Sequence, residues 1–540
     1  MAREDADVLI VGGGSVGLAA AAFLGYQGIE SVIVEARGAL THHPRATSVG
    51  PRAWEALFGI GLRDRVLAIA ERRSRSRGRI ETRTLAEADP RDLDAKPDPF
   101  KSFVDPIAGF SPASDVGGLG QNQLDPLLLD TASAFGATMR WRTKAVGFAQ
   151  DEKAVKIALS GEDTGETVFE ARYVIAADGD ASPTRDLLNI PVSGPASLGG
   201  GRINIVFRAD LSRLLPGSGF VLATITHPEA SGMLHSMDGN ENLWSYHLDA
   251  DGENLREAYP PERCAELVRV GLGCPDQELD ILSALPWRPT GRLAERYVEG
   301  RVVLMGDAAH TMPPTGGFGL TTGIGDAQNL AWKLAMVLRG EAGPGLLDTY
   351  DAERRPRARF ARDQAVLRLR NPELHWNPGA TAERAATGIV EHAVAHLCER
   401  YESTAVVDPS TRPLSYDDAA ANLDGSPGTR VPHVRVRAGG NVISTLDLVE
   451  RGFTLVTGSA GEGWESAART VSARIGIPLR VRVIAADRVV DAEGWEKPAG
   501  IEPDGALLVR PDQVVGWRAA RRTARSADDL EQALRLILAR

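Results

Sequence analysis

The chain has 540 residues, of which 43% are hydrophobic, and a formal net charge of −11. This length exceeds what one hydrophobic core serves, so two or three domains are expected, and the negative charge argues against general nucleic-acid binding. No apolar stretch approaches the roughly 20 residues that span a bilayer, and no secretory signal is visible, so no membrane partner is expected. The three cysteines form no CxxC pair, which argues against disulfides and favours a cytoplasmic protein.

The first 35 residues predict a β-α-β unit. A short β-branched run over Asp7–Val11 predicts a strand, and an alanine-rich segment over Ser15–Gln27 has helical periodicity. A second strand is predicted over Ser31–Glu35. Such an opening is typical of a nucleotide-binding domain.

Three glycines lie at GxGxxG spacing where the first strand passes into the helix: Gly12, Gly14 and Gly17. The first permits a tight turn, the second lets the backbone approach a pyrophosphate, and the third allows close helix–strand packing. The helix N-terminus supplies the positive end of the dipole. Glu35 is placed to accept hydrogen bonds from ribose hydroxyls. The pattern predicts a dinucleotide site and does not separate NAD from FAD.

Two further strands are predicted over Tyr173–Ala177 and Arg301–Met305, and each ends in a turn that contains an aspartate. The first turn holds Asp178 and Gly179, and the second holds Asp307. Between these strands lie alternating segments such as "RINIVFRADL" and "LWSYHLDA". They predict a sheet inserted into the nucleotide-binding domain, where it would cover a substrate.

The remaining sequence suggests the domain boundaries. A long helical region follows Asp326 and continues to about residue 400, and the polar, turn-rich residues 401–429 predict a linker. From residue 430 strands and helices alternate again, which predicts a small α/β domain. We therefore expect a nucleotide-binding domain over residues 1–185 and 290–400, a substrate-binding domain over 186–289, and a C-terminal domain over 430–540.

Two longer segments complete the pattern: "YVIAADGDASPTRDLL" and "GRVVLMGDAAHTMPPTGGFGLTTGIGDAQNLAWKLA". Together with the GxGxxG turn they resemble the three fingerprints of the group A flavoprotein aromatic hydroxylases, which use FAD and NADPH. The whole chain resembles the phenol and aromatic-polyketide hydroxylases, including chlorophenol and anthracycline hydroxylases. The resemblance implies an α/β fold with a Rossmann-like FAD-binding domain, an inserted mixed or antiparallel-sheet domain and a C-terminal thioredoxin-like domain. That last domain contains no cysteine, so it cannot exchange dithiols.

The resemblance also implies roles for particular residues. Asp307 would hydrogen-bond the FAD ribityl chain, and Asp178 with Gly179 would serve both FAD and NADPH. Arg45 and Gln121 would contact the flavin or its phosphates. The full set expected to bind the cofactor is Gly12, Gly14, Ser15, Gly17, Glu35, Arg37, Arg45, Gln121, Asp178, Gly179, Asp307, Pro314, Gly317, Gly319, Leu320 and Thr321.

The Pro/Gly-rich loop after Asp307 also has a physical rationale. Pro314 stiffens a turn that would pack against the isoalloxazine, and Gly317 and Gly319 remove side chains where backbone approaches the ring. A helix that begins near Thr321–Gly323 would aim its N–H groups at the flavin's pyrimidine edge, where negative charge develops on reduction. Many relatives have an asparagine before "TG", where this chain has Leu320–Thr321; we expect FAD binding to survive this difference.

The implied reaction is a monooxygenation. NADPH or NADH reduces FAD, the reduced flavin captures O₂ as a hydroperoxide, and a phenol takes up one oxygen atom. No metal is expected, because the ten histidines show no ligand spacing. Pro314 and Gly317 are the candidate catalytic residues at the flavin. His227, His235 and Tyr246, in the inserted sheet, are candidate phenol-activating bases, with an ordinary sheet role as the alternative for each.

Small and apolar residues of the inserted sheet suggest the substrate. They are Ala223, Ala230, Gly232, Met233 and Met237. They would leave room for a flat multi-ring ligand, which favours an aromatic polyketide of antibiotic biosynthesis over a simple phenol or chlorophenol. A Baeyer–Villiger oxygenase, an NAD-dependent dehydrogenase and a flavin-free scaffold protein remain open alternatives. A homodimer is also expected.

Overall fold

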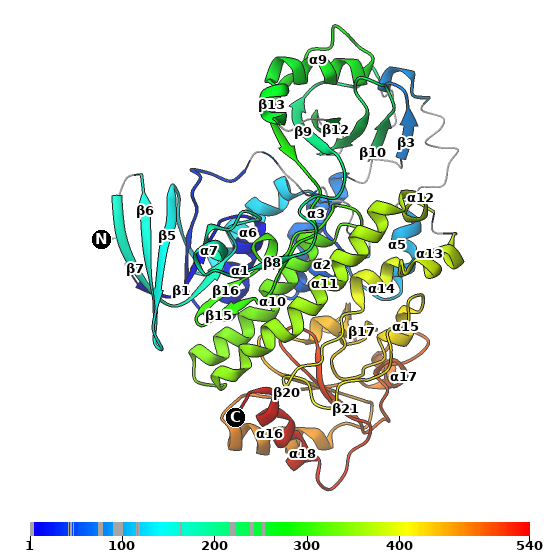
Figure 1. Ribbon diagram of the computed structural model, residues 1–540. Helices are drawn as coiled ribbons and strands as arrows, with labels where there is room; N and C mark the ends of the chain where they lie inside the picture. Colours follow the sequence, from blue (N-terminus) through cyan, green and yellow to red (C-terminus); the bar gives the residue numbers. More distant parts are fainter. Residues whose placement is uncertain are drawn as a thin grey trace.

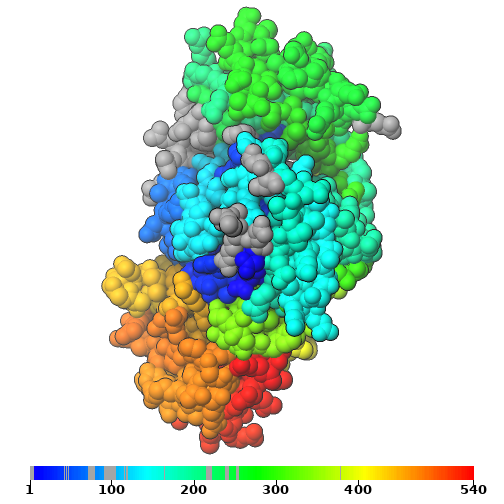
Figure 2. Space-filling view, turned by 90° about the vertical axis from the view of Figure 1, so that its left-hand side faces the viewer, coloured from blue at the N-terminus to red at the C-terminus, as the bar shows by residue number. Residues whose placement is uncertain are grey.

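The computed structural model describes residues 5–540 except 42, 44, 45, 47, 74–78, 90–100, 115, 117–118, 163–164, 215–221, 238–241, 251–253 and 378. Arg45, an expected cofactor contact, therefore lies outside the described residues. Three bodies follow one another along the molecule (Figure 1). Figure 2 shows the same order by colour, with green residues at the top, blue and cyan residues of the N-terminal part in the middle and the orange and red C-terminal residues at the bottom.

The first sheet has eight strands, with the main order β15-β16-β7-β1-β2-β4. Its strands are β1 (Asp5–Val11), β2 (Ser31–Val34), β4 (Thr138–Arg140), β5 (Thr143–Gln150), β6 (Val155–Gly161), β7 (Gly165–Ala176), β15 (Val298–Glu299) and β16 (Val302–Leu304). β1 runs parallel to both neighbours, so that Leu9 pairs with Val32 on one side and Val174 on the other. β16 is also parallel to β7. The carboxyl ends of these strands therefore share one edge, where open α/β sheets bind ligands.

Helices cover this sheet and reach the same edge. They are α1 (Ser15–Tyr26), α2 (Pro51–Phe58), α3 (Arg63–Arg73), α5 (Lys101–Ala108), α6 (Gln121–Ala134), α7 (Pro183–Leu187), α10 (Phe318–Leu338), α11 (Asp348–Arg370), α12 (Pro372–His375), α13 (Thr381–Thr387) and α14 (His392–Leu397). The small residues Ala19–Ala22 of α1 are buried, and α1 packs directly against α6 and α10. Small side chains let these helices approach closely, which brings the N-termini of α1 and α10 to the sheet edge.

The cap sheet has the strand order β13-β9-β12-β11-β10-β3. Its strands are β3 (Arg79–Thr82), β9 (Gly201–Arg208), β10 (Leu222–Ile225), β11 (Gly232–Ser236), β12 (Leu243–Ala250) and β13 (Asp280–Trp287), and α8 (Leu255–Ala258) and α9 (Pro261–Leu272) follow β12. One face packs under α9, where Phe207, Trp244 and Leu267 form a core. The substrate-binding domain was predicted over residues 186–289, and this prediction was wrong in leaving out β3. That strand pairs in parallel with β10 and covers its otherwise exposed edge.

The C-terminal domain holds a sheet of order β20-β19-β21-β22 and a hairpin β17-β18. Its elements are α15 (Ala419–Asn422), β17 (Arg435–Ala438), β18 (Asn441–Ser444), β19 (Thr454–Thr457), α16 (Gly463–Ile475), β20 (Arg480–Val483), α17 (Glu496–Ala499), β21 (Ala506–Val509), β22 (Val515–Ala519) and α18 (Ser526–Ile537). Its core includes Trp464 and Leu508 and continues onto Trp332 of α10. This shared core attaches the domain to the helix that begins at the carboxyl edge of the first sheet.

The segment 401–429 does not behave as the linker that its polar composition predicted. Tyr401 and Ala405 are buried, and Ser403 donates a hydrogen bond from Oγ to Oε1 of Glu353 in α11 at 2.6 Å. Gly428 donates its backbone N–H to the carbonyl oxygen of Val515 at 2.8 Å. Tertiary contacts hold this turn-rich segment, so composition alone misjudged it.

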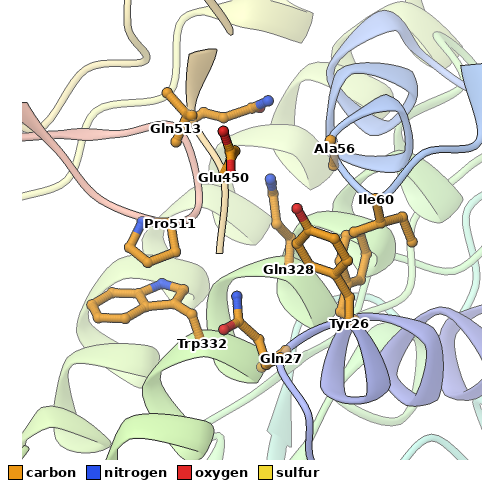
Figure 3. Close-up of a pocket in the computed structure, with 13 residues that line it drawn as sticks. Tyr26, Gln27, Ala56, Ile60, Gln328, Trp332, Glu450, Pro511 and Gln513 are labelled. Atoms are coloured by element: carbon orange, nitrogen blue, oxygen red, sulfur yellow. The ribbon is translucent and has the colours of Figure 1, made fainter. Parts of the chain in front are cut away.

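α1, α2 and α10 meet the C-terminal domain around a cavity of about 20 Å³. Figure 3 shows Tyr26, Gln328 and Trp332 on the helical side and Glu450 and Pro511 on the other. That volume is enough for about one water molecule. It is therefore a packing gap between domains and too small for a dinucleotide or an aromatic substrate.

Candidate functional site

The three glycine- and aspartate-bearing turns converge at the carboxyl edge of the first sheet. Gly12 has a φ of +105°, and a Cβ added there would lie 2.7 Å from the carbonyl carbon of Ala177, in the second turn. A Cβ on Gly306, in the third turn, would lie 3.0 Å from Cγ2 of Val16 in α1. Arg185 donates to the carbonyl oxygen of Ala308 at 3.1 Å. Segments almost 300 residues apart in sequence thus form one structure.

The β1–α1 turn has the shape of a phosphate cradle. A Cβ added at Gly14 would meet no atom within 4 Å, whereas one at Gly17 would strike the carbonyl oxygen of Gly12. Gly14 is the N-cap of α1, and no side chain among the described residues caps that helix. The first N–H groups of α1 therefore have no side-chain cap among the described residues, as an anion site at a helix N-terminus requires.

Glu35 is held beside this turn. Its Oε2 accepts the backbone N–H of Gly13 at 2.7 Å, and its Oε1 accepts the N–H and Nε of Arg37 at 2.9 and 2.8 Å. Burial would raise the pKa of Glu35, but the hydrogen bonds from Arg37 and Gly13 lower it below its usual value. The side chain is thus a fixed carboxylate next to the turn, and its contact with a ribose stays a prediction.

A second carboxyl group lies at the same turn, and no local sequence pattern indicated it. Asp125 of α6 accepts hydrogen bonds from Ser15 Oγ and, at 3.3 Å, from Gln121 Nε2. Burial raises the pKa of Asp125 to about 6. Ser15 and Gln121, both expected at the cofactor, therefore have side chains that are already joined through Asp125.

The second turn is stabilised by hydrogen bonds between its own residues. Asp178 accepts Ser182 Oγ at 2.6 Å through one carboxylate oxygen and the backbone N–H of Thr184 at 2.9 Å through the other. Gly179 has a φ of +85°, which favours glycine. Both carboxylate oxygens of Asp178 thus help to fix the start of α7. Direct contact of Asp178 or Gly179 with FAD or NADPH stays a prediction.

The third turn presents Asp307 outward. Asp307 is exposed, while its neighbours Gly306 and Ala308 are buried. The backbone N–H of Gly306 donates to Asp326 of α10 at 3.1 Å, and Asp326 also contacts Arg354 Nε at 2.8 Å. Burial would raise the pKa of Asp326, but His310 and Arg354 lower it. A buried ion pair thus supports the turn from behind while Asp307 faces outward.

The Pro/Gly loop leads into the N-terminus of α10. Pro314 is exposed, its carbonyl oxygen accepts the N–H of Gly317 at 3.0 Å, and Gly317 has a φ of +69°. The helix begins at Phe318, so the expected start near Thr321 was wrong. Gly317 is the N-cap, without a side-chain cap among the described residues, and an added Cβ at Gly319 would meet only Met312 Cγ, at 3.8 Å.

Side chains behind this loop hold it in place. Thr321 Oγ1 accepts the N–H of Gly50 at 2.8 Å and donates to the carbonyl oxygen of Gly317 at 3.0 Å. Leu320 packs against the main core. His396, which the sequence analysis did not single out, places Nε2 3.0 Å from the carbonyl oxygen of Gly316. The loop is therefore fixed from three directions, which suits backbone that must approach a flat ring.

The two faces of the cap sheet differ, and this corrects the prediction for Tyr246. Tyr246 lies on the α9 face, where its hydroxyl donates to the carbonyl oxygen of Ala230 and burial raises its pKa well above the usual value. Ala223 and Ala230 belong to the same core. Strand alternation sends these side chains away from the other face. They therefore neither activate a phenol nor make room for one.

His227 lies outside the strands, in the β10–β11 turn, where its Nδ1 accepts the N–H of Glu229 at 3.3 Å. This contact uses one ring nitrogen within the turn itself. A role for His227 as a base stays a prediction.

The opposite face of the cap sheet, which we call the open face, carries a polar and aromatic cluster that the sequence analysis did not assemble. Its members are His43, Asn204, His235, Ser245, His247, Ser283 and Trp287. His43 comes from the loop that follows β2, and its Nδ1 hydrogen-bonds Ser283 Oγ of β13. This bond joins the open face to the first domain. Period-two alternation along β12 would have placed Ser245 and His247 together.

The residues at the sheet edge fit FAD. An uncapped helix start beside Gly14 suits the pyrophosphate, a fixed carboxylate at Glu35 suits a ribose, and the exposed Asp307 suits a chain of hydroxyl groups. A second uncapped helix start, at Gly317, suits the electron-accepting edge of a flavin.

Comparison with known families agrees with this geometry. Residues 5–365 match the family described as "FAD binding domain", and residues 424–540 match "Aromatic-ring hydroxylase, C-terminal". The chain is 37% identical to the tetracenomycin B2 monooxygenase-dioxygenase of Streptomyces olivaceus, over 100% of this chain and 99% of the relative. It is 31% identical to the 2,4-dichlorophenol 6-monooxygenase of Delftia acidovorans, over 99% and 98% respectively.

A solved structure extends the likeness to three dimensions. A ternary complex of aklavinone-11 hydroxylase with FAD and aklavinone superposes with a TM-score of 0.84 and 33% identity, covering 100% of both chains. Both domain families and the full-length relatives lead to the same assignment: this chain belongs to the FAD-dependent aromatic-ring hydroxylases, and its cofactors are FAD, a reduced nicotinamide nucleotide and O₂.

Proposed function

We propose that this protein is a monooxygenase that uses FAD, NADPH or NADH, and O₂ to hydroxylate a phenolic, polycyclic aromatic polyketide. One observation carries the proposal: the FAD-shaped edge of the first sheet is joined, through the His43–Ser283 hydrogen bond, to the open face of the cap sheet. A substrate on that face would lie between the cap and the Pro/Gly loop that carries Pro314 and Gly317.

FAD, when bound, supplies the redox chemistry and the activation of O₂. The chain would hold the pyrophosphate at the N-terminus of α1 and the ribityl chain at Asp307. The N–H groups of the first turn of α10 would face the pyrimidine edge, where they stabilise negative charge. Pro314 and the glycines that follow would present backbone, and little side chain, to the ring. The cap sheet would exclude water from the substrate.

The breadth of the open face supports a multi-ring substrate. His247 pairs across the sheet with Asn204 and Met233, and Asn204 pairs with Leu285. Leu285 is 36% exposed, and Met233 is half-buried, so the row offers apolar surface beside polar groups. Relatives named for tetracenomycin and aklavinone cover the whole chain, and both are polycyclic compounds. A flat apolar surface with few polar groups suits such ligands.

Substrate-stimulated NADPH consumption tests the proposal. The FAD-loaded enzyme would be given a tetracyclic hydroxynaphthacenequinone or 2,4-dichlorophenol, and oxidation of NADPH would be followed at 340 nm. We expect stimulation by the tetracyclic compound and a product heavier by one oxygen atom, with NMR identifying a new ring hydroxyl. Stimulation by dichlorophenol alone would make the protein a simple-phenol hydroxylase. Insertion of oxygen into a carbon–carbon bond would identify a Baeyer–Villiger enzyme.

Two further expectations belong to the same proposal. The three cysteines are free, which favours the cytoplasm, and we infer a homodimer on the basis of the sequence analysis alone. Among the described helices, none combines the length and the apolar character that crossing a membrane demands. Light scattering of the FAD-loaded protein at micromolar concentration would decide between monomer and dimer.

A further inference from the structure

His247 lies at the centre of the open face. It is on β12, between Asn204 of β9 and Met233 of β11 in cross-strand register, and its side chain is half-buried. Two aromatic rings meet it edge-on, His235 at a centroid distance of 5.5 Å and Trp287 at 5.7 Å, with interplanar angles of 83° and 88°. The imidazole therefore has one defined orientation.

A hydrogen-bond chain favours one tautomer of this imidazole. Ser245 Oγ donates its single proton to Asn204 Oδ1 at 2.7 Å. The same hydroxyl lies 3.4 Å from His247 Nε2, where its oxygen is left as an acceptor. This arrangement favours the tautomer in which Nε2 of His247 carries the hydrogen and Nδ1 carries the lone pair.

No described residue donates a hydrogen bond to Nδ1 of His247. Among the described residues, Nδ1 of His247 is buried and has no hydrogen-bond partner, a condition that is rare in native proteins and unfavourable to folding. Burial, with the nearby His235, Arg202 and His43, keeps the pKa of His247 well below its usual value. The ring is therefore a neutral acceptor at pH 7.

We propose that His247 Nδ1 accepts a hydrogen bond from a phenolic hydroxyl of the substrate, and that Ser245 and Asn204 hold the imidazole in the tautomer that makes this possible. The inference rests on the proposed function and adds a specificity-determining residue to it. A phenol that donates to nitrogen gains electron density in its ring and is fixed in rotation. His247 would thus favour hydroxylated rings and select the carbon that faces the flavin.

Hydrogen bonding and position on the sheet favour His247 over His43, His227 and Tyr246. His43 uses Nδ1 to contact Ser283, and His227 uses Nδ1 within its own turn. Tyr246, the adjacent residue, points to the α9 core. His247 alone among these side chains combines a place on the open face with a ring nitrogen that lacks a partner among the described residues.

A matched pair of ligands tests the inference: 2-hydroxyanthraquinone, which can donate, and 2-methoxyanthraquinone, which cannot. Dissociation constants would be measured on FAD-loaded protein from the change in the flavin absorption spectrum. One hydrogen bond predicts an approximately 3- to 10-fold preference of the wild type for the hydroxy compound. His247→Phe should remove that preference by weakening the hydroxy compound alone.

Two polar variants separate a hydrogen bond from a packing role. An asparagine amide reaches the position of Nδ1, whereas a glutamine amide reaches that of Nε2. His247→Asn should therefore retain the preference, and His247→Gln should lose it. These two variants keep the test decisive if His247→Phe binds FAD poorly. Leu282→Ala, an exposed position on β13, is the control and should behave as the wild type.

Each outcome has one meaning. Equal binding of both anthraquinones by the wild type, or an unchanged preference in His247→Phe and His247→Gln, would overturn the inference and leave the proposed function standing. If the wild type binds neither anthraquinone, the polycyclic part of the proposed function fails, and 2,4-dichlorophenol against 2,4-dichloroanisole repeats the test of His247. If no compound of either pair binds, both proposals fail. Loss of preference in His227→Ala but not in His247→Phe would assign the role to His227.

Discussion

The carboxylate of Asp326, in the third turn of α10, accepts the backbone N–H of Gly306 at 3.1 Å. Gly306 immediately precedes Asp307, so this bond ties the α10 helix to the turn that we propose binds the ribityl chain of FAD. Behind it, Arg354 lies 2.8 Å from the second carboxylate oxygen, and both side chains are fully buried. The Gly306–Asp307 turn therefore depends on a fully buried ion pair.

Asp326→Asn should both destabilise the protein and loosen the cofactor. The change leaves Arg354 buried without its carboxylate partner at that contact, and removal of one partner of a buried pair lowers the unfolding free energy by about 3–5 kcal/mol. Urea unfolding followed by circular dichroism would measure this. Asp363→Asn, which breaks an exposed pair with Arg362, should change stability by less than about 1 kcal/mol. Equal effects of the two substitutions would contradict the supporting role.

Gly14 and Gly17 should fail in different ways when they are replaced by valine. Gly14→Val meets no atom within 4 Å at Cβ, so the protein should fold, with a loss of about 1 kcal/mol, yet exclude the pyrophosphate. Gly17→Val drives Cβ against the carbonyl oxygen of Gly12 and should destabilise folding by more than about 3 kcal/mol. Thermal melting and the flavin content of purified protein separate the two. Normal FAD content in Gly14→Val would contradict the assignment of the β1–α1 turn as the pyrophosphate site.

Asp307→Ala should weaken FAD binding without harm to folding, because the side chain is exposed. Loss of a hydrogen bond to a charged group predicts an affinity lower by about 10- to 100-fold. Titration of apoprotein with FAD, followed by quenching of flavin fluorescence, gives the dissociation constant. Asp276→Ala, at an exposed position of the cap, should leave the affinity unchanged. If Asp307→Ala and the wild type bind FAD with equal affinity, Asp307 does not bind the ribityl chain.

Asp125 should make the stability of the apoprotein depend on pH. Its folded-state pKa is raised to about 6, above an unfolded value of about 3.9, so the folded state binds the proton more tightly. Its contribution is therefore full below pH 4 and is lost as the pH rises through 6, at about 3 kcal/mol for two pKa units. Asp125→Asn should remove this slope and stabilise the apoprotein at pH 7 relative to wild type. Unfolding at pH 4.5 and 7 checks the sign, and an unaltered slope would contradict it.

Arg510 should anchor the C-terminal domain to helices α10 and α11. It contacts Oε1 and Oε2 of Glu353 in α11 at 2.7 and 2.8 Å, and Lys333 of α10 lies 2.8 Å from the same carboxylate. Arg510→Met should lower the unfolding free energy by about 3–5 kcal/mol. Arg535→Met, which breaks a half-exposed pair with Glu531, should lower it by less than about 1 kcal/mol. Denaturant titration of both variants makes the comparison, and similar losses would argue against the anchor.

Local sequence by itself determined the β-α-β opening, the family and the glycine- and aspartate-bearing turns at the carboxyl edge of the first sheet. Gly12, Gly14 and Gly17 act through short-range backbone geometry, which is written in spacing alone. The period-two pattern of "LWSYHLDA" also predicted a strand correctly, now β12. Such features need only a few neighbouring residues, and therefore they can be inferred without coordinates.

Tertiary structure decided which face of each strand the substrate meets and which distant residues share a site. Tyr246 and His247 are adjacent in sequence, yet the α9 helix covers one and leaves the other half-buried. β3 joined the cap sheet, residues 401–429 became packed structure, and Asp125 met Ser15 across 110 residues. Long-range packing has no local signature, because it depends on how separate elements bury their apolar faces against one another.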